Sequence, residues 1–219
     1  MIELANVTLS HRGLPVLRNA SFHVDAGEIV LLSGDTGSGK TSMMRAIYGD
    51  LAVDTGRIII DGVELTRLSR RALPELRRRM GLIFQDDKLL EDRTVYDNIR
   101  FALSIQMDSP KQITRRAMEI LAELGLSHLR SLMPNHLSGG EAQRIGVARA
   151  LANSPRIVLA DEPTGDLDPA TAVEIFRYLA GRHTPSRAFI ISTHDLARAT
   201  TVFPHARRLH LSGGTIREM

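Results

Sequence analysis

The chain has 219 residues, of which 43% are hydrophobic and 24% are charged, enough apolar content for a buried core and too much for a disordered chain. It contains no cysteine, which excludes disulfides, thiolate metal sites and a cysteine nucleophile. A formal net charge of +3 is too small to indicate a nucleic-acid binder, so we expect no nucleic-acid partner.

The first sixty residues contain short apolar runs bounded by turn residues, which predict an antiparallel β layer. The expected strands are residues 2–9, 21–24 and 57–60. The expected turns include Arg12-Gly13 and Asp61-Gly62.

Four other runs are apolar on both faces, which is typical of buried parallel strands. They are residues 28–33, 80–84, 156–160 and 188–192. Because helical patterns lie between these runs, we expect an α/β core with its ligand chemistry at the carboxyl ends of the strands.

The middle of the chain, from Thr94 to Asn153, contains no convincing strand. Apolar residues recur there at helical spacing, namely Ile113, Ala117, Ile120, Leu121 and Leu124. We therefore expect a single domain, 1–219, in which residues 1–86 and 155–219 form the core with its antiparallel layer. Residues from about 87 to 154 are expected to form a helical subdomain.

A phosphate-loop pattern follows the expected strand at residues 28–33. Its glycines let the backbone wrap closely around phosphate oxygens, and the helix expected from about Thr41 points its free N–H groups at the anion. Lys40 adds a point charge for the outer phosphates, and the Thr41 hydroxyl can ligate magnesium. Alone, this motif leaves kinases, GTPases and motors open. The residues predicted to bind the nucleotide here are Gly34, Asp35, Thr36, Gly37, Ser38, Gly39, Lys40, Thr41 and Ser42.

Residues 137–144 read Leu-Ser-Gly-Gly-Glu-Ala-Gln-Arg, in which Ser138 and Glu141 form a capping box that opens a helix. Two glycines in the first turn cost about 1 kcal/mol each in a helix. They are explained if bare backbone N–H groups must approach an anion.

A second acidic site follows the strand at residues 156–160. Asp161 at the strand end can hold magnesium, and Glu162 can polarise a water that attacks the terminal phosphate. Asp168-Pro169 is expected to be an N-cap followed by proline at the first helical position.

The Leu-Ser-Gly-Gly-Glu segment, placed between the phosphate loop and Asp161-Glu162, resembles the signature of the ABC ATPases, and the resemblance covers essentially the whole chain. It implies a P-loop NTPase parallel-sheet core, an N-terminal antiparallel β layer and a helical ABC-specific subdomain. It also implies ATP and Mg²⁺ as cofactors and an ATP-dependent, head-to-tail homodimer. The residues implied to reach the partner copy's ATP are Ser138, Gly139, Gly140 and Asp168.

The same resemblance assigns roles to three more positions. Gln85 matches the glutamine that senses magnesium and the attacking water, and His194 matches the switch histidine that contacts the terminal phosphate and holds Glu162. The implied catalytic residues are thus Glu162, His194 and Gln85. The implied magnesium ligands are Thr41, Gln85 and Asp161.

Two positions depart from the family pattern. His11 stands where the family stacks an aromatic ring on adenine, and its smaller ring leaves GTP use open. Asp35 puts a carboxylate inside the phosphate loop, so we predict that it points to solvent.

Residues 77–86 and 92–98 look most like cell-division ATPases of the FtsE family. That resemblance implies an integral membrane partner resembling FtsX, docked around residues 86–93, and control of cell-wall hydrolysis. The chain lacks a secretory signal and any apolar run of roughly 18 residues, so we expect no transmembrane segment and a peripheral position on the cytoplasmic face of the cell membrane.

Alternatives stay open at several levels. Lipoprotein-releasing and macrolide-exporter ATPases share residues 161–165, and soluble nucleic-acid ABC proteins or nucleotide kinases fit fewer of the motifs. Leu89-Leu90 belong either to the docking groove or to ordinary core packing. A cluster of arginines forms either a solvated surface or a contact for anionic lipid headgroups, and its members are Arg67, Arg70, Arg71, Arg77, Arg78 and Arg79.

Overall fold

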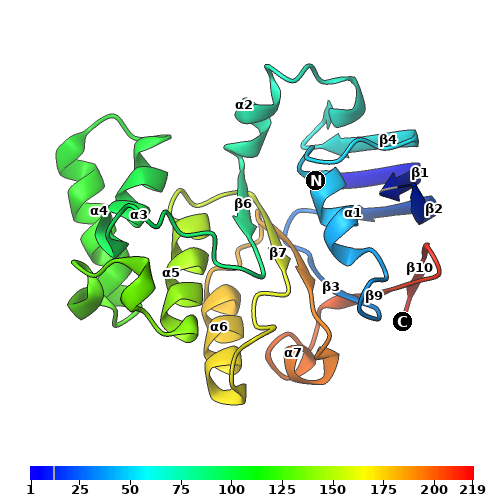
Figure 1. Cartoon of the computed structure of the whole chain (residues 1–219). Coiled ribbons are helices and arrows are strands. Elements are labelled where there is room, and N and C mark those ends of the chain that lie inside the picture. The colour runs from blue at the N-terminus through cyan, green and yellow to red at the C-terminus, as the bar shows by residue number, and fades with distance from the viewer. Residues whose placement is uncertain (12) are drawn as a thin grey trace.

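Two β-sheets and a set of helices form the structure (Figure 1), a computed structural model that describes residues 1–11 and 13–219. One sheet is antiparallel, as predicted for the first sixty residues, with the strand order β2-β1-β4-β5. Of the two predicted turns, Asp61-Gly62 joins β4 to β5, whereas Arg12 lies outside the described residues. The strands are β1 (Ile2–His11), β2 (Leu14–Val24), β4 (Thr55–Ile60) and β5 (Val63–Glu64).

The second sheet has the order β10-β9-β3-β8-β7-β6. The four strands predicted to be parallel lie side by side in it, β9 extends the parallel set, and β10 pairs antiparallel with β9. The strands β9 and β10 were not predicted, because their apolar residues alternate with polar ones near an exposed edge. The six strands are β3 (Ile29–Ser33), β6 (Met80–Ile83), β7 (Ile157–Asp161), β8 (Ala188–Ser192), β9 (Arg207–Ser212) and β10 (Thr215–Glu218).

Helices pack on both faces of the six-stranded sheet. Between the two sheets lies α1 (Lys40–Ile47), whose Met43 and Met44 join a core shared with β1, β4 and β8 (Figure 1). On the opposite face, α6 (Pro169–Gly181) and α7 (Leu196–Val202) bury Phe176 and Ala199 against β3, β7 and β8. Both faces of the strands are therefore covered, which explains their continuous apolar runs.

The middle of the chain is helical, as predicted, and has an apolar core of its own. Leu89 is 8% exposed and belongs to this core, which supports packing as its role. Outside this region, the connection from β5 to β6 contains η1 (Leu65–Arg67) and α2 (Leu73–Arg77). The helices of the middle region are α3 (Val95–Ser104), α4 (Pro110–Glu123), η2 (Ser127–Leu129), η3 (Pro134–His136) and α5 (Gly139–Leu151).

Helix α5 joins the helical region to the sheet. Its buried Ile145 and Ala148 pack in the helical core. Its Val147 and Leu151 pack in the same apolar cluster as Ile83 of β6, on one face of the sheet. None of the helices in the described parts of the chain is both long and apolar enough to cross a membrane.

A side chain at Gly81 would disturb the contact of α5 with β6. A Cβ there would lie 2.7 Å from the Ala150 carbonyl oxygen and 2.8 Å from Pro155 Cγ. We expect Gly81→Ala to lower the free energy of unfolding by about 1–3 kcal/mol through overpacking. Gly181→Ala is the control, because a Cβ there meets nothing within 4 Å. Urea unfolding midpoints measure both, and equal midpoints would contradict the prediction.

Candidate active site

The phosphate loop connects β3 to α1 in a conformation that requires glycine. Gly34 has φ 151°, and a Cβ added there would lie 2.4 Å from the Leu211 carbonyl oxygen. Gly39 has φ 107°, and its Cβ would lie 2.3 Å from Cγ1 of Val16. The loop is thus pressed against β2 and β9, and its glycines allow that approach as well as a left-handed backbone. Asp35 is exposed, as predicted.

Lys40 lies inside this loop with only 5% of its side chain exposed. Its Nζ donates to the carbonyl oxygens of Gly34 (2.8 Å) and Asp35 (3.3 Å) and lies 3.2 Å from Oε1 of Glu162. The Ser38 hydroxyl is buried without a hydrogen-bond partner among the described residues. The groups that hold the Lys40 cation can be displaced by a ligand, and the Ser38 hydroxyl has no partner to lose in the described part of the chain. Both features suit a loop that binds an anion.

The end of β7 is tied to the end of β8 by one hydroxyl. Ser192 donates from Oγ to Oδ1 of Asp161 (2.7 Å) and accepts the backbone N–H of Glu162 (2.8 Å). Glu162 has φ 45°, a left-handed conformation that costs a non-glycine residue about 1–3 kcal/mol. Ser192 therefore holds Glu162 in a strained turn. The sequence analysis missed this residue, although its place directly before Thr193-His194 at a strand end was a signal.

The Glu162 carboxylate has a cationic or titratable neighbour on each oxygen. Oε1 faces Lys40, and Oε2 lies 3.1 Å from Nδ1 of His194. The Glu162 side chain is 18% exposed and that of His194 is 55% exposed, so solvent reaches the pair from the histidine side. The structure thus brings together Lys40, Glu162 and His194 from three separate elements.

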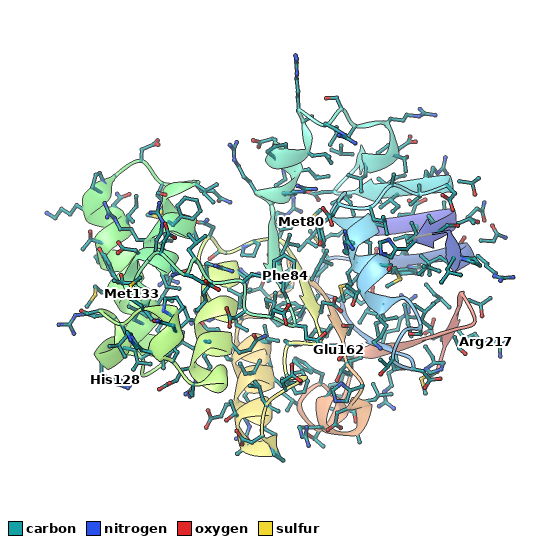
Figure 2. All side chains as sticks on the ribbon, viewed as in Figure 1. Met80, Phe84, His128, Met133, Glu162 and Arg217 are labelled. Carbon is teal, nitrogen blue, oxygen red and sulfur yellow. The ribbon has the colours of Figure 1, made fainter. Side chains whose placement is uncertain are left out.

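Gln85 follows β6 and reaches the same edge of the sheet. Figure 2 shows Phe84 and Glu162 on the same side of Met80, beyond the ends of β6 and β7. A Cβ added at Gly165 would lie 3.6 Å from both Nε2 of Gln85 and Oε2 of Glu162. The three predicted magnesium ligands, Thr41, Gln85 and Asp161, line one cavity of about 350 Å³.

The Ser138 turn forms the predicted capping box at the start of α5. The Ser138 N–H donates to Oε2 of Glu141 (2.8 Å), and the Glu141 N–H donates to Ser138 Oγ (3.3 Å). The backbone N–H of Ser138, and next its hydroxyl, donate to the Glu141 carboxylate and lower its pKa. The contribution of this carboxylate to stability is therefore present above its unfolded pKa and is lost as pH falls through the folded value. Gly139 is exposed, and a Cβ there would meet nothing within 4 Å.

Asp168 caps the neighbouring helix α6, as predicted. Its carboxylate accepts the backbone N–H groups of Ala170 (3.0 Å) and Thr171 (3.1 Å), and hydrogen bonds from Thr171 above all lower its pKa. A Cβ on Gly140 would lie 3.0 Å from Cγ2 of Thr171, so the amino ends of α5 and α6 are adjacent. Within the described residues, the hydrogen bonds of Ser138 remain inside its own turn.

His11 ends β1 and pairs with Leu14 across the β1–β2 hairpin. Val16 on the same hairpin touches the phosphate loop at Gly39. The hairpin end that carries His11 therefore lies near the loop, although no contact between His11 and the other predicted residues appears in the described structure.

Comparison with known proteins places this geometry in a family. Residues 17–165 match the ABC transporter family model. The chain is 40% identical over 197 residues to the cell division ATP-binding protein FtsE of Escherichia coli (strain K12), covering 90% of this chain and 89% of that protein. It is 39% identical over 206 residues to the methionine import ATP-binding protein MetN of Carboxydothermus hydrogenoformans, covering 92% of this chain and 61% of MetN.

Among solved structures, the fold matches a dimeric, post-hydrolysis state of the ATP-binding cassette MJ0796 bound to ADP and Pi. The TM-score is 0.91 with 31% sequence identity, and the match covers 100% of this chain and 98% of that one. The family match contains the phosphate loop, the Ser138 turn and Asp161-Glu162. The chain therefore belongs to the ABC transporter family, as an ATP-binding and ATP-hydrolysing subunit.

Proposed function

We propose that Glu162 is the general base of ATP hydrolysis and that Lys40, Gln85 and His194 complete the catalytic site. The contacts of Glu162 with Lys40 and His194 are the observation that carries this proposal. The strained turn and the contact of Oε2 with His194 limit the directions that the Glu162 carboxylate can take, which suits a group that must accept a proton from one particular water.

Lys40 and Glu162 neutralise each other in the present arrangement. A triphosphate bound in the loop competes with Glu162 for the Lys40 ammonium, and the released Oε1 then faces the attacking water. His194 keeps hold of Oε2 during this exchange, so the carboxylate turns toward the water without leaving the site. Mg²⁺, held by Thr41, Asp161 and Gln85, would neutralise phosphate charge.

The second half of the site comes from another copy of the chain in this proposal. Gly139 and Gly140 begin α5, where backbone N–H groups and the positive end of the helix dipole favour an anion. These groups are exposed or half-exposed, and a related cassette is dimeric with ADP and Pi bound. We infer that Ser138, Gly139, Gly140 and Asp168 act on the nucleotide of the partner copy.

We further propose that this subunit works with an integral membrane partner resembling FtsX in cell division, at the cytoplasmic face of the membrane. The 40% identity to E. coli FtsE over most of both chains supports this role. The proposed arrangement is one cassette, with residues 1–86 and 155–219 as core and about 87–154 as helical subdomain. The similarity to MetN supports a second candidate, solute import with a membrane permease.

The contacts of the arginine cluster bear on the choice between a solvated surface and a contact for anionic lipid headgroups. Arg67 pairs with Glu64 at 3.1 Å, Arg78 pairs with Glu75 at 2.9 Å, and Arg77 donates to the carbonyl oxygens at the end of α1. Within the described chain, only Arg77 of these three is thus tied to the backbone, whereas Arg67 and Arg78 form exposed surface ion pairs, with 83% and 51% of their side chains exposed.

Glu162→Gln removes the proposed base while keeping the size of the side chain. We expect ATP binding to persist while turnover falls by about 100-fold or more, because general base catalysis contributes 10²–10⁴-fold. The variant should then accumulate as an ATP-bound dimer, measured by light scattering together with phosphate release. Glu119→Gln, on the exposed face of α4, is the control and should hydrolyse ATP normally.

The shared site predicts that a second change blocks assembly. Glu162→Gln combined with Ser138→Arg should bind ATP but stay monomeric, because the long side chain obstructs the turn that meets the partner's phosphates. Wild-type turnover by Glu162→Gln would refute its role as base, and an ATP-bound dimer of the double variant would refute the shared site.

The membrane partner is tested by affinity purification from detergent extracts of the native cells, with and without ATP. We expect a polytopic membrane protein similar to FtsX, identified by mass spectrometry. Recovery of a solute permease instead would support the import candidate. Recovery of nucleic acid without a membrane protein would contradict both membrane roles.

A further inference from the structure

Three residues on one face of α5 contact the segment that carries Gln85. Gln143, Gly146 and Arg149 are spaced three apart, so they lie along one side of the helix. They meet residues 84–88, the chain that leaves β6. This face is separate from the Ser138 turn at the start of the same helix.

Gln143 fixes the segment before Gln85. Its side chain is 5% exposed, and its Nε2 donates to the carbonyl oxygens of Phe84 (3.2 Å) and Pro163 (3.0 Å). Phe84 directly precedes Gln85, and Pro163 directly follows Glu162. One buried amide thus ties the chains that carry two proposed catalytic side chains.

Arg149 fixes the segment after Gln85. Its guanidinium donates to the carbonyl oxygens of Lys88 (2.7 Å) and Asp87 (3.0 Å) and to Oδ1 of Asn98 (3.3 Å). Burial lowers the pKa of Arg149, and the three acceptors compensate for its lost hydration. Gly146 lets the backbone come this close, because a Cβ there would lie 3.1 Å from the Asp87 carbonyl oxygen.

Asn98 extends the attachment further along the chain. It is fully buried on α3 and its Oδ1 accepts the N–H of Leu90 (2.8 Å). Its two amide hydrogens are shared among the carbonyl oxygens of Leu90, Arg93 and Thr94. The backbone is therefore anchored at Phe84 and again from Asp87 onward. Only Gln85 and Asp86 lie between the anchors, and both are exposed.

We propose that Gln143 and Arg149 are positioning residues that hold Gln85 in place for catalysis. The proposal rests on the function proposed above for Gln85. Two anchors on either side of a two-residue span restrict the directions that the Gln85 side chain can take. Its amide then stays at the cavity shared with Thr41 and Asp161.

We call Gln143 and Arg149, together with the contacts that they make on either side of Gln85, the clamp. Arg149→Met tests the clamp, and Arg187→Met is its matched control. Arg187 is also a partly buried arginine that donates to main-chain carbonyls, those of Pro155 and Arg182, but at the amino ends of β7 and β8. Burial lowers the pKa of both side chains. Both variants should unfold at lower temperature than the wild type.

Only Arg149→Met should lower kcat, by about 10-fold or more, because small displacements of a catalytic group cost that much. Its Kd for ATP should remain unchanged, since the phosphate loop is intact. Amide hydrogen exchange in residues 84–94 should accelerate in Arg149→Met alone. Arg149→Lys, which keeps one charged donor, should recover part of the rate. If Arg149→Met does not fold, Gln143→Ala replaces it with the same expectations.

Gln85→Ala with and without Arg149→Met shows whether the clamp acts through Gln85. The double variant should be no slower than Gln85→Ala alone, because a positioning residue has no effect once its target is gone. Multiplied losses would overturn the proposal. An unchanged kcat in Gln85→Ala would instead refute the role proposed above for Gln85, and the exchange comparison would still decide whether Gln143 and Arg149 hold this segment.

Discussion

The parallel register of β3, β8, β7 and β6 is the constraint on which the site depends. Leu32 pairs with Ser192, Ser192 pairs with Asp161, and Ala160 pairs with Ile83. These pairings bring the carboxyl ends of four strands to one edge, and each end continues into a different functional segment. A shift of one residue in the β7–β8 pairing would turn Ser192 away from Asp161 and remove the hydroxyl that holds the Glu162 turn.

The position of helix α5 depends on the same register, because the helix packs against β6 at Gly81. The helix carries the Ser138 turn at its start and the Gln143–Arg149 face along its length. The helical region is thus attached to the sheet through a helix whose polar groups contact the chains around Gln85 and Glu162. Packing and site geometry share the same side chains here.

Local patterns were sufficient for much of this architecture. The four buried strands, the antiparallel layer, the Ser138–Glu141 capping box and the Asp168-Pro169 helix start were predicted because each depends on residues close together in sequence. The exposed carboxylate of Asp35 followed from its charge.

Contacts between distant residues were beyond such patterns. Arg149 meets Lys88 across 61 positions, Gln143 meets Phe84 across 59, and Ser192 meets Asp161 across 31. A buried glutamine or arginine reads from sequence as an ordinary polar residue on a helix. The strands β9 and β10, at one end of the sheet, were missed for a related reason, since their half-exposed residues lack a continuous apolar run.

The contacts of the buried Lys40 ammonium have a thermodynamic consequence for the proposed binding of nucleotide. With two carbonyl oxygens and a carboxylate around it, the cation is solvated by the protein itself, so no hydration shell has to be stripped when substrate arrives. In the proposed site, an incoming phosphate would gain only the difference between its own attraction for Lys40 and that of the groups it displaces. Such an exchange moderates affinity for the nucleotide and eases its departure, as a subunit that must cycle repeatedly requires.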